Sequence, residues 1–175
     1  MGPLKDIKIF DLTRVLAGPH CTQILGDLGA DIIKIERVET GDDTRKFAPP
    51  YMKDTDGKDT NQSAYFSGTN RNKRSLTLDL SSEEGQSIAR ELISKSDILV
   101  ENFKVGTLKK YNLDYESLKD QFPDLIYCSI TGFGQTGPYA SRPAYDALGQ
   151  GRGGGMRLTG GPDGVLCKRV WPLRI

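Results

Sequence analysis

Residues suited to binding a phosphorylated ligand stand at or near the ends of several expected strands. The cationic, amide-rich run 70–74 leads into one strand, Arg37 follows another, and Asn102 and Phe103 follow a third. Arginine offers a planar fork to a phosphate and a flat face to an adenine ring, whereas lysine offers a point charge. Charge runs of this kind are also typical of a solvated surface. Arg37, Lys73, Asn102 and Phe103 are therefore the candidates for a site that holds a phosphorylated ligand with an aromatic base.

The segment Gly132–Gly137 is a literal G-x-G-x-x-G motif that directly follows an apolar strand. A dinucleotide site needs the last glycine inside the first turn of a helix and an acidic residue about 20 positions further on. Here Pro138 and Pro143 interrupt the following segment, and Asp163 lies in a Gly/Pro turn. We interpret the motif as a tight glycine turn and keep a nucleotide-binding oxidoreductase as an alternative function.

Histidine and cysteine chemistry is sparse in this sequence. His20 is the single histidine, which excludes a site with several histidine ligands, and we interpret it as structural. Cys21, Cys128 and Cys167 are far apart and form neither a paired disulfide framework nor a C-x-x-C clamp. We expect reduced thiols and no metal site.

The charge balance excludes two classes of partner. The 175 residues include 24 Lys and Arg against 23 Asp and Glu, a net charge of +1. Neither nucleic acid nor an anionic membrane surface is therefore an expected main partner. No apolar run approaches the roughly 20 residues of a membrane helix, and the first ten residues lack the apolar stretch of a secretory signal. We expect a cytoplasmic protein, with a mitochondrial location left open if the N-terminus is incomplete.

The candidate residues must be positioned by strands and helices. The sequence patterns typical of these two elements alternate along the chain. Residues 7–12 alternate apolar with polar side chains, 18–28 have helical periodicity closed by Gly29, and 31–36 form a β-branched run. This order predicts a β-α-β unit with parallel strands. The polar segment 40–69 is predicted to be a surface loop with short helical turns.

The same alternation continues beyond the loop. The expected elements are strands at 75–80, 97–100 and 125–130, a helix from about 83 to 95, and short helices at 108–111 and 115–122. The rhythm predicts an α/β fold with a doubly wound, mostly parallel sheet of about five strands. Glycines are dense from 132 to 164, so that residues 147–156 are expected to form a weak helix at best.

Six segments, in order along residues 4–164, resemble the class III coenzyme A transferases, the formyl-CoA transferase and carnitine-CoA transferase family. The segments are Asp11–Pro19, Gly26–Arg37, Gly41–Arg45, Asn72–Ser75, Ile98–Phe103 and Ile126–Pro138. The resemblance implies a Rossmann-like large domain, CoA in the form of an acyl-CoA substrate, a carboxylic acid as the other substrate, and homodimers of interlocked chains. The related racemases carry a histidine where this chain has Tyr145, which favours a transferase.

The resemblance also implies a set of site residues. Leu16 and Ala17 would line the CoA channel, Arg37 would meet the adenosine end, and Leu78 would contact the nucleotide. The remaining positions would extend this surface or approach the thioester: Lys73, Asn102, Phe103 and Lys104 for the surface, Tyr145 and Asp146 for the thioester.

The family's nucleophile is an Asp shortly beyond the turn that matches Thr159–Gly164, where it forms a mixed anhydride and then holds CoA as a thioester. No acidic residue follows Asp163 here. We therefore expect 1–164 to be the N-terminal part of a partial large domain, 165–175 a divergent tail, and the second domain absent. We assign no catalytic residue and expect the chain to be inactive alone. A non-enzymatic protein that pairs with a full-length relative through an exposed strand edge is the other alternative.

Overall fold

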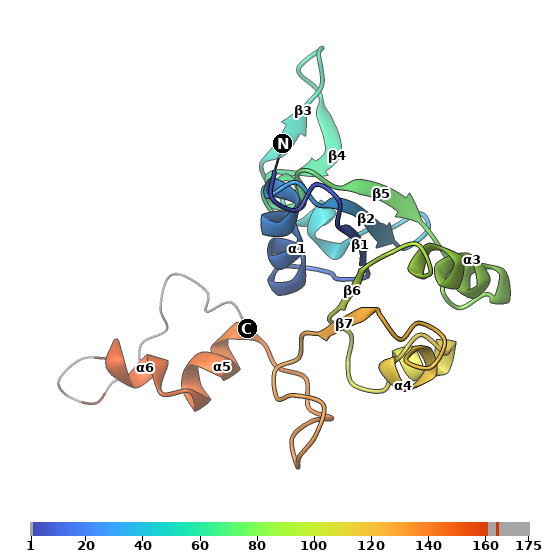
Figure 1. Ribbon diagram of the computed structural model, residues 1–175. Coiled ribbons are helices and arrows are strands. Elements are labelled where there is room, and N and C mark those ends of the chain that lie inside the picture. The colour runs from blue at the N-terminus through green and yellow to red at the C-terminus, as the bar shows by residue number, and fades with distance from the viewer. Residues whose placement is uncertain (1, 161–163, 165–175) are drawn as a thin grey trace.

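The computed structural model describes residues 2–160 and 164, and Figure 1 shows an α/β arrangement built on one twisted sheet. Five strands form this sheet: β1 (Lys8–Asp11), β2 (Asp31–Glu36), β5 (Arg74–Thr77), β6 (Ile98–Glu101) and β7 (Ile126–Ser129). They are all parallel and lie in the order β5-β2-β1-β6-β7. The predicted doubly wound parallel sheet is confirmed.

The strand order reverses its direction of growth between β1 and β6. The chain first adds β2 and β5 on one side of β1, then returns to place β6 and β7 on the other side. Phe10 consequently has Ile33 and Leu99 as its partners on the two neighbouring strands. Open α/β sheets bind their ligands at such a reversal, beyond the carboxyl ends of the two central strands, and we refer to this place as the crevice.

The central strands are apolar on both faces because helices cover both sides. Phe10 and Leu99 pack against Ala89 and Ile93 of α3 (Glu83–Ile93). On the other face, buried Ile9, Ile32 and Val100 pack with Leu25 of α1 (Ala17–Asp27). Each central strand therefore alternates between two separate cores, which explains its nearly continuous apolar sequence.

The helix boundaries follow the predicted signals. Ser82 caps α3 by accepting a hydrogen bond from the Gly85 amide at 3.0 Å. After α1, Gly29 takes a left-handed conformation with φ of 105°, which ends the helix as predicted. The short elements η2 (Leu108–Tyr111) and α4 (Tyr115–Leu118) then add Leu108 and Leu118 to the core on the α3 side.

The prediction of a loop over 40–69 was wrong in detail. The segment contains the 3-10 helix η1 (Asp43–Lys46), a hairpin of β3 (Tyr51–Lys53) with β4 (Asp59–Ser63), and α2 (Ala64–Asn70). The hairpin projects from the body in Figure 1, and most of its side chains are exposed, so its sequence shows no apolar alternation. The Ser63 hydroxyl caps α2 by accepting from the Phe66 amide at 2.9 Å.

The glycine-dense segment, predicted to form a weak helix at best over 147–156, forms two short helices. These are α5 (Asp146–Arg152) and α6 (Gly155–Leu158), separated by Gly154 with φ of 76°. In Figure 1 they lie together, apart from the sheet. No helix among the described residues is long and apolar enough to span a bilayer. Within the same residues, no group of three or more histidine, cysteine, aspartate or glutamate side chains is placed to hold a metal ion.

Candidate functional site

The chain reversal brings the ends of β1 and β6 together through Arg14 and Asn102. The Asn102 side-chain amide donates to the Arg14 carbonyl at 2.8 Å and accepts from the Arg14 amide at 2.8 Å. The Arg14 guanidinium lies over the Phe103 ring, 5.1 Å from its centre. A charged fork and an aromatic face are thus presented side by side at the crevice.

The turn between β1 and α1 has an unusual backbone. Val15 adopts φ of 70°, a conformation that β-branched residues rarely take. Its amide points at the Asp42 carboxylate, 3.4 Å from both oxygens. Leu16 precedes the helix and offers no side-chain acceptor to the first helical N–H groups.

A second guanidinium reaches this place from the end of β2. The Arg37 Nε donates to the Gly41 carbonyl at 3.3 Å, and its Nη2 is paired with Asp43. The other Asp43 oxygen lies 3.8 Å from the Arg14 Nη1. One carboxylate on η1 thus stands between two arginines. A cavity of about 380 Å³ adjoins Arg37, lined by the ends of β2 and β5, by η1 and by Asn61 of the hairpin.

A buried ion pair lies beneath the exposed side chains of Arg14, Arg37 and Asp43. The Lys34 ammonium lies 2.9 Å from the Asp42 carboxylate and donates to the Thr13 carbonyl at 2.8 Å, and the two charged side chains are 1% and 0% exposed. Burial by itself would raise the pKa of Asp42, but the Lys34 charge and the hydrogen bonds from Thr44 bring that pKa below its usual value. The pair links β1, β2 and η1 at the point where the strained turn begins.

The buried Glu36 carboxylate accepts a second set of hydrogen bonds, which also hold the loop after β2. Arg45 donates to both carboxylate oxygens at 2.7 Å, Ser75 donates at 2.6 Å, and the Asp42 amide donates at 2.9 Å. These donors outweigh burial and lower the pKa of Glu36. The Arg45 guanidinium stacks on Phe66 at 3.8 Å, which ties α2 to η1.

The structure places Lys73 in the interior. Its ammonium lies 3.1 Å from the Asp11 carboxylate, 2.8 Å from the Pro19 carbonyl and 3.0 Å from the Asn70 side-chain oxygen. The side chain is only 2% exposed. Burial lowers the pKa of Lys73 to about 8, with the Asp11 charge acting against that shift. Its contact with CoA stays a prediction, and the structure shows it joining β1, α1 and α2.

The other predicted site residues divide into two groups. Leu16, Ala17, Arg37, Asn102 and Phe103 follow the carboxyl ends of β1, β2 and β6, and the exposed Lys104 continues from there. Leu78 is half-buried after β5 and packs on the core. By contrast, Tyr145 is 81% exposed beside α5, and the Asp146 carboxylate accepts from Gln150 within that helix. The approach of these last two residues to the thioester stays a prediction.

The glycine motif after β7 lies in turns. Gly134 and Gly137 have φ of 78° and 91°, and the next helix begins only at Asp146. The helical start that a dinucleotide fingerprint requires is therefore not at Gly137. The interpretation of the motif as a glycine turn is confirmed.

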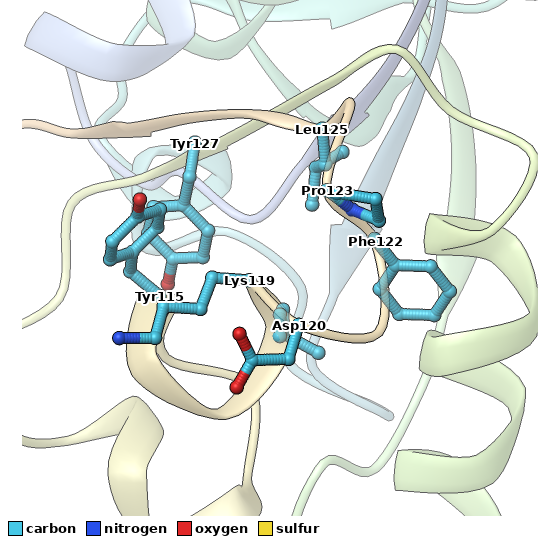
Figure 2. Close-up of a pocket in the computed structure, with 8 residues that line it drawn as sticks. Tyr115, Lys119, Asp120, Phe122, Pro123, Leu125 and Tyr127 are labelled. Atoms are coloured by element: carbon cyan, nitrogen blue, oxygen red, sulfur yellow. The ribbon is translucent and has the colours of Figure 1, made fainter.

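A second cavity, of about 260 Å³, lies at the opposite end of the sheet (Figure 2). Its lining comes from α4 and from the entry to β7: Tyr115, Leu118, Lys119, Asp120, Phe122, Pro123, Leu125 and Tyr127. The Tyr127 hydroxyl is engaged with the Leu113 carbonyl at 2.9 Å. Because this cavity adjoins the amino end of β7, we place the functional site at the reversal between β1 and β6 instead.

Comparison with known proteins identifies the family of this chain. The model of CoA-transferase family III matches residues 4–173. The chain belongs to CoA-transferase family III. The succinate–glutarate CoA-transferase of Agrobacterium fabrum is 52% identical over 166 residues, which are 95% of this chain and 41% of that protein. The succinyl-CoA:glutarate CoA-transferase of Mus musculus is 46% identical over 164 residues, 94% of this chain and 36% of that protein.

A solved structure of the family has the same fold. The crystal structure of a CaiB/BaiF family protein from Brucella suis superposes with a TM-score of 0.90 at 52% identity, and the match covers 97% of this chain and 44% of that one. The chain thus spans about two fifths of the length of the relatives that it matches. The expected boundary after residue 164 concerns the tail 165–175, which lies outside the described residues.

Sequence reasoning missed four residues of this candidate site: Lys34, Asp42, Asp43 and Arg14. A signal for the first was present, because a lysine inside the apolar run 31–36 of a central parallel strand must be buried and therefore needs an anion. The neighbouring acids Asp42 and Asp43 gave no sign of which one is buried. Arg14 stood within a resemblance segment, but its contact with Asn102 depends on the strand order.

Proposed function

We propose that the chain forms the CoA-binding surface of a transferase that moves CoA between dicarboxylic acids. The observation that carries this proposal is the meeting of Arg14, Arg37 and Phe103 at the reversal of a doubly wound sheet in a family III chain. CoA carries phosphates and an adenine ring, and these are the groups that arginine forks and an aromatic face recognise.

Each residue of the surface has a separate role in this proposal. Arg37 and Phe103 hold the nucleotide end, and Asn102 fixes the Arg14 backbone. Leu16 and Ala17, both half-buried, offer apolar contacts to the pantetheine arm. These groups bind and orient the thioester, which lowers the entropic part of the barrier.

In this proposal, the carboxylates near the crevice stabilise the fold and do not react with the substrate. Asp11, Glu36 and Asp42 are held by buried cations and hydroxyls. Glu101 is 5% exposed and accepts from the Phe103 amide at 2.7 Å. Burial raises the pKa of Glu101. We therefore assign the nucleophile implied by the resemblance to none of these four residues.

The acids are inferred from the names of two relatives. Both act with succinate or succinyl-CoA and with glutarate, which are dicarboxylic acids of four and five carbons. We propose a dicarboxylate of this size as donor or acceptor. Because the chain is expected to be inactive alone, it is joined to the complementary part of the Agrobacterium fabrum relative, and exchange between succinyl-CoA and labelled glutarate is followed by mass spectrometry. A monocarboxylate of equal length is the control. Equal exchange with the monocarboxylate would contradict this choice of acid.

Binding is tested separately from exchange. We expect isothermal titration calorimetry to show heat with CoA and none with NAD. The Arg74→Met variant is a matched control because Arg74 forms an exposed pair with Asp31 at the amino ends of β5 and β2. It should bind CoA like the wild type. Heat with NAD and none with CoA would favour the oxidoreductase alternative.

We also propose a homodimer, as the family resemblance implies. Supporting this, α5 and α6 lie apart from the sheet in Figure 1, and the segment exposes three large apolar side chains: Tyr145 (81% exposed), Leu148 (42%) and Leu158 (88%). A surface of this kind is typical of a segment that packs against another chain. Light scattering after size exclusion should give twice the chain mass, and a monomer at micromolar concentration would contradict the proposal.

A further inference from the structure

Asp43 occupies a position between two arginines that its contribution to stability does not explain. The side chains of Arg14, Arg37 and Asp43 are 36%, 48% and 43% exposed. Ion pairs this exposed stabilise a fold very little. Two guanidinium groups brought close together also repel each other unless an anion lies between them. The arrangement therefore has the form of an anion site in which a side-chain carboxylate is the present occupant.

Both guanidinium groups are held in place independently of Asp43. The Arg14 backbone is clamped from both sides by the Asn102 amide, and its guanidinium rests on Phe103. Arg37 is anchored through its Nε on the Gly41 carbonyl. Removal of the Asp43 carboxylate would leave both guanidinium groups in place. An anion that binds there would therefore lose little free energy to the ordering of these side chains.

The Asp43 carboxylate, unlike that of Asp42, is exposed to solvent. Asp42, its neighbour on the same turn, is buried and engaged by Lys34, so the backbone of η1 stays where it is. The described contacts of the Asp43 side chain are the two arginines. A phosphate carries more charge and more acceptor oxygens than a carboxylate and forms stronger paired hydrogen bonds with guanidinium groups.

We propose that Arg14 joins Arg37 in binding a phosphate of CoA, and that Asp43 is an internal competitor which the phosphate displaces. This inference rests on the proposed CoA-binding function. The phosphate is either the 3′-phosphate of the ribose or part of the diphosphate, since both have the required charge. Asp43 thereby keeps the two arginines paired when the nucleotide is absent. Because the phosphate must displace this carboxylate, Asp43 lowers the affinity of the chain for CoA.

The test measures the affinity of four variants for CoA and for 3′-dephospho-CoA by calorimetry. Asp43→Asn removes the competing charge at nearly constant shape, and we expect it to bind CoA about 5-fold more tightly. Arg14→Met should bind about 10-fold more weakly. In the double variant the gain from Asp43→Asn should shrink, because the two side chains act on one anion. Arg74→Met is the control with an exposed pair elsewhere.

The dephospho ligand identifies the phosphate. If the 3′-phosphate is bound, both substitutions should lose their effect with 3′-dephospho-CoA; if the diphosphate is bound, both effects should persist. Circular dichroism and thermal unfolding verify that each variant is folded. Unchanged or weaker CoA binding by a folded Asp43→Asn variant would overturn the inference and leave the proposed function standing. Absence of CoA binding by the wild type would overturn both.

Discussion

Lys73 is the residue whose placement has the clearest consequence for stability. Its ammonium is buried against Asp11 and two neutral oxygens, between β1, α1 and α2. A buried ion pair contributes little over a well-packed apolar pair, but loss of one partner costs about 3–5 kcal/mol because the other charge stays buried. Lys73 therefore behaves as a structural residue that also titrates.

Its titration predicts a rise of stability with pH. Burial lowers the pKa of Lys73 to about 8 in the folded chain, whereas an unfolded lysine has a pKa of about 10.4. Between these values the unfolded chain binds the proton that the folded chain has released, so this side chain's contribution to the unfolding free energy increases. From pH 8 to 10 we expect wild type to gain about 2 kcal/mol relative to Lys73→Met. Urea unfolding of both proteins measures this, and a constant difference would contradict it.

Val15 carries backbone strain at the edge of the crevice. With φ of 70°, it lies in a region that costs L-residues about 1–2 kcal/mol and that glycine enters freely. We expect Val15→Gly to be about 1 kcal/mol more stable than Val15→Ala, since the two variants differ only in the Cβ atom. Chemical denaturation provides the comparison. Equal stability of the two variants would show that the turn is unstrained.

At the scale of elements, the loop after β2 joins the sheet to the site. Asp42 is buried and holds Lys34 and the Val15 amide, while the adjacent Asp43 faces the arginines. Two neighbouring acids, the cap and the first residue of η1, thus have different functions. The buried one holds the loop on the sheet, and the exposed one contacts the side chains proposed to bind the nucleotide.

This difference predicts unequal effects of the same substitution. Asp42→Asn should destabilise the chain by about 3–5 kcal/mol because the buried Lys34 loses its anion. Asp43→Asn, the matched control, should cost less than about 1 kcal/mol. The pKa of Asp42 is lowered, so its stabilisation is present above the unfolded value of about 3.9 and is lost as pH falls below that value. Unfolding at pH 7 and pH 3 tests both statements; similar losses for the two variants at pH 7 would contradict them.

Local signals predicted most elements, and their failures have physical causes. Alternation and caps indicated the sheet strands, α1 and α3, because most of these elements bury apolar side chains and Ser82 caps α3. The hairpin β3–β4 was missed because its side chains face solvent. In the site, Arg37, Asn102 and Phe103 were predicted from their positions after strands. Arg14 and Asp43 were not, because their contact joins separate strand ends.

At the scale of the whole molecule, the α5–α6 segment differs from the rest of the chain. α1 and α3 bury apolar side chains on the sheet, whereas α5 and α6 lie apart from it and pack with one another. Three glycines within or just after α5, at 149, 151 and 153, weaken its helix further. Little tertiary packing therefore stabilises this segment in a single copy of the chain.

Hydrogen exchange should reveal this difference directly. Amides of 146–158 should exchange at least about 100-fold faster than those of α3, whose Ala89 and Ile93 are buried on the sheet. The measurement is exchange followed by mass spectrometry, in dilute solution and again at high protein concentration. Slower exchange of 146–158 at high concentration would support the proposed homodimer. Protection equal to that of α3 in a dilute monomer would contradict the prediction.

The sequence alone determined the α/β class, the parallel strands and the relationship to class III CoA-transferases. These properties depend on short-range periodicity and on motif order, which are written along the chain. Only the tertiary structure decided that β6 lies beside β1, that Asn102 clamps a residue 88 positions away, and that Lys73 is buried on Asp11, 62 positions away. Contacts over such separations depend on the order of the strands in the sheet and on how the helices pack against it. A local sequence pattern does not specify that order.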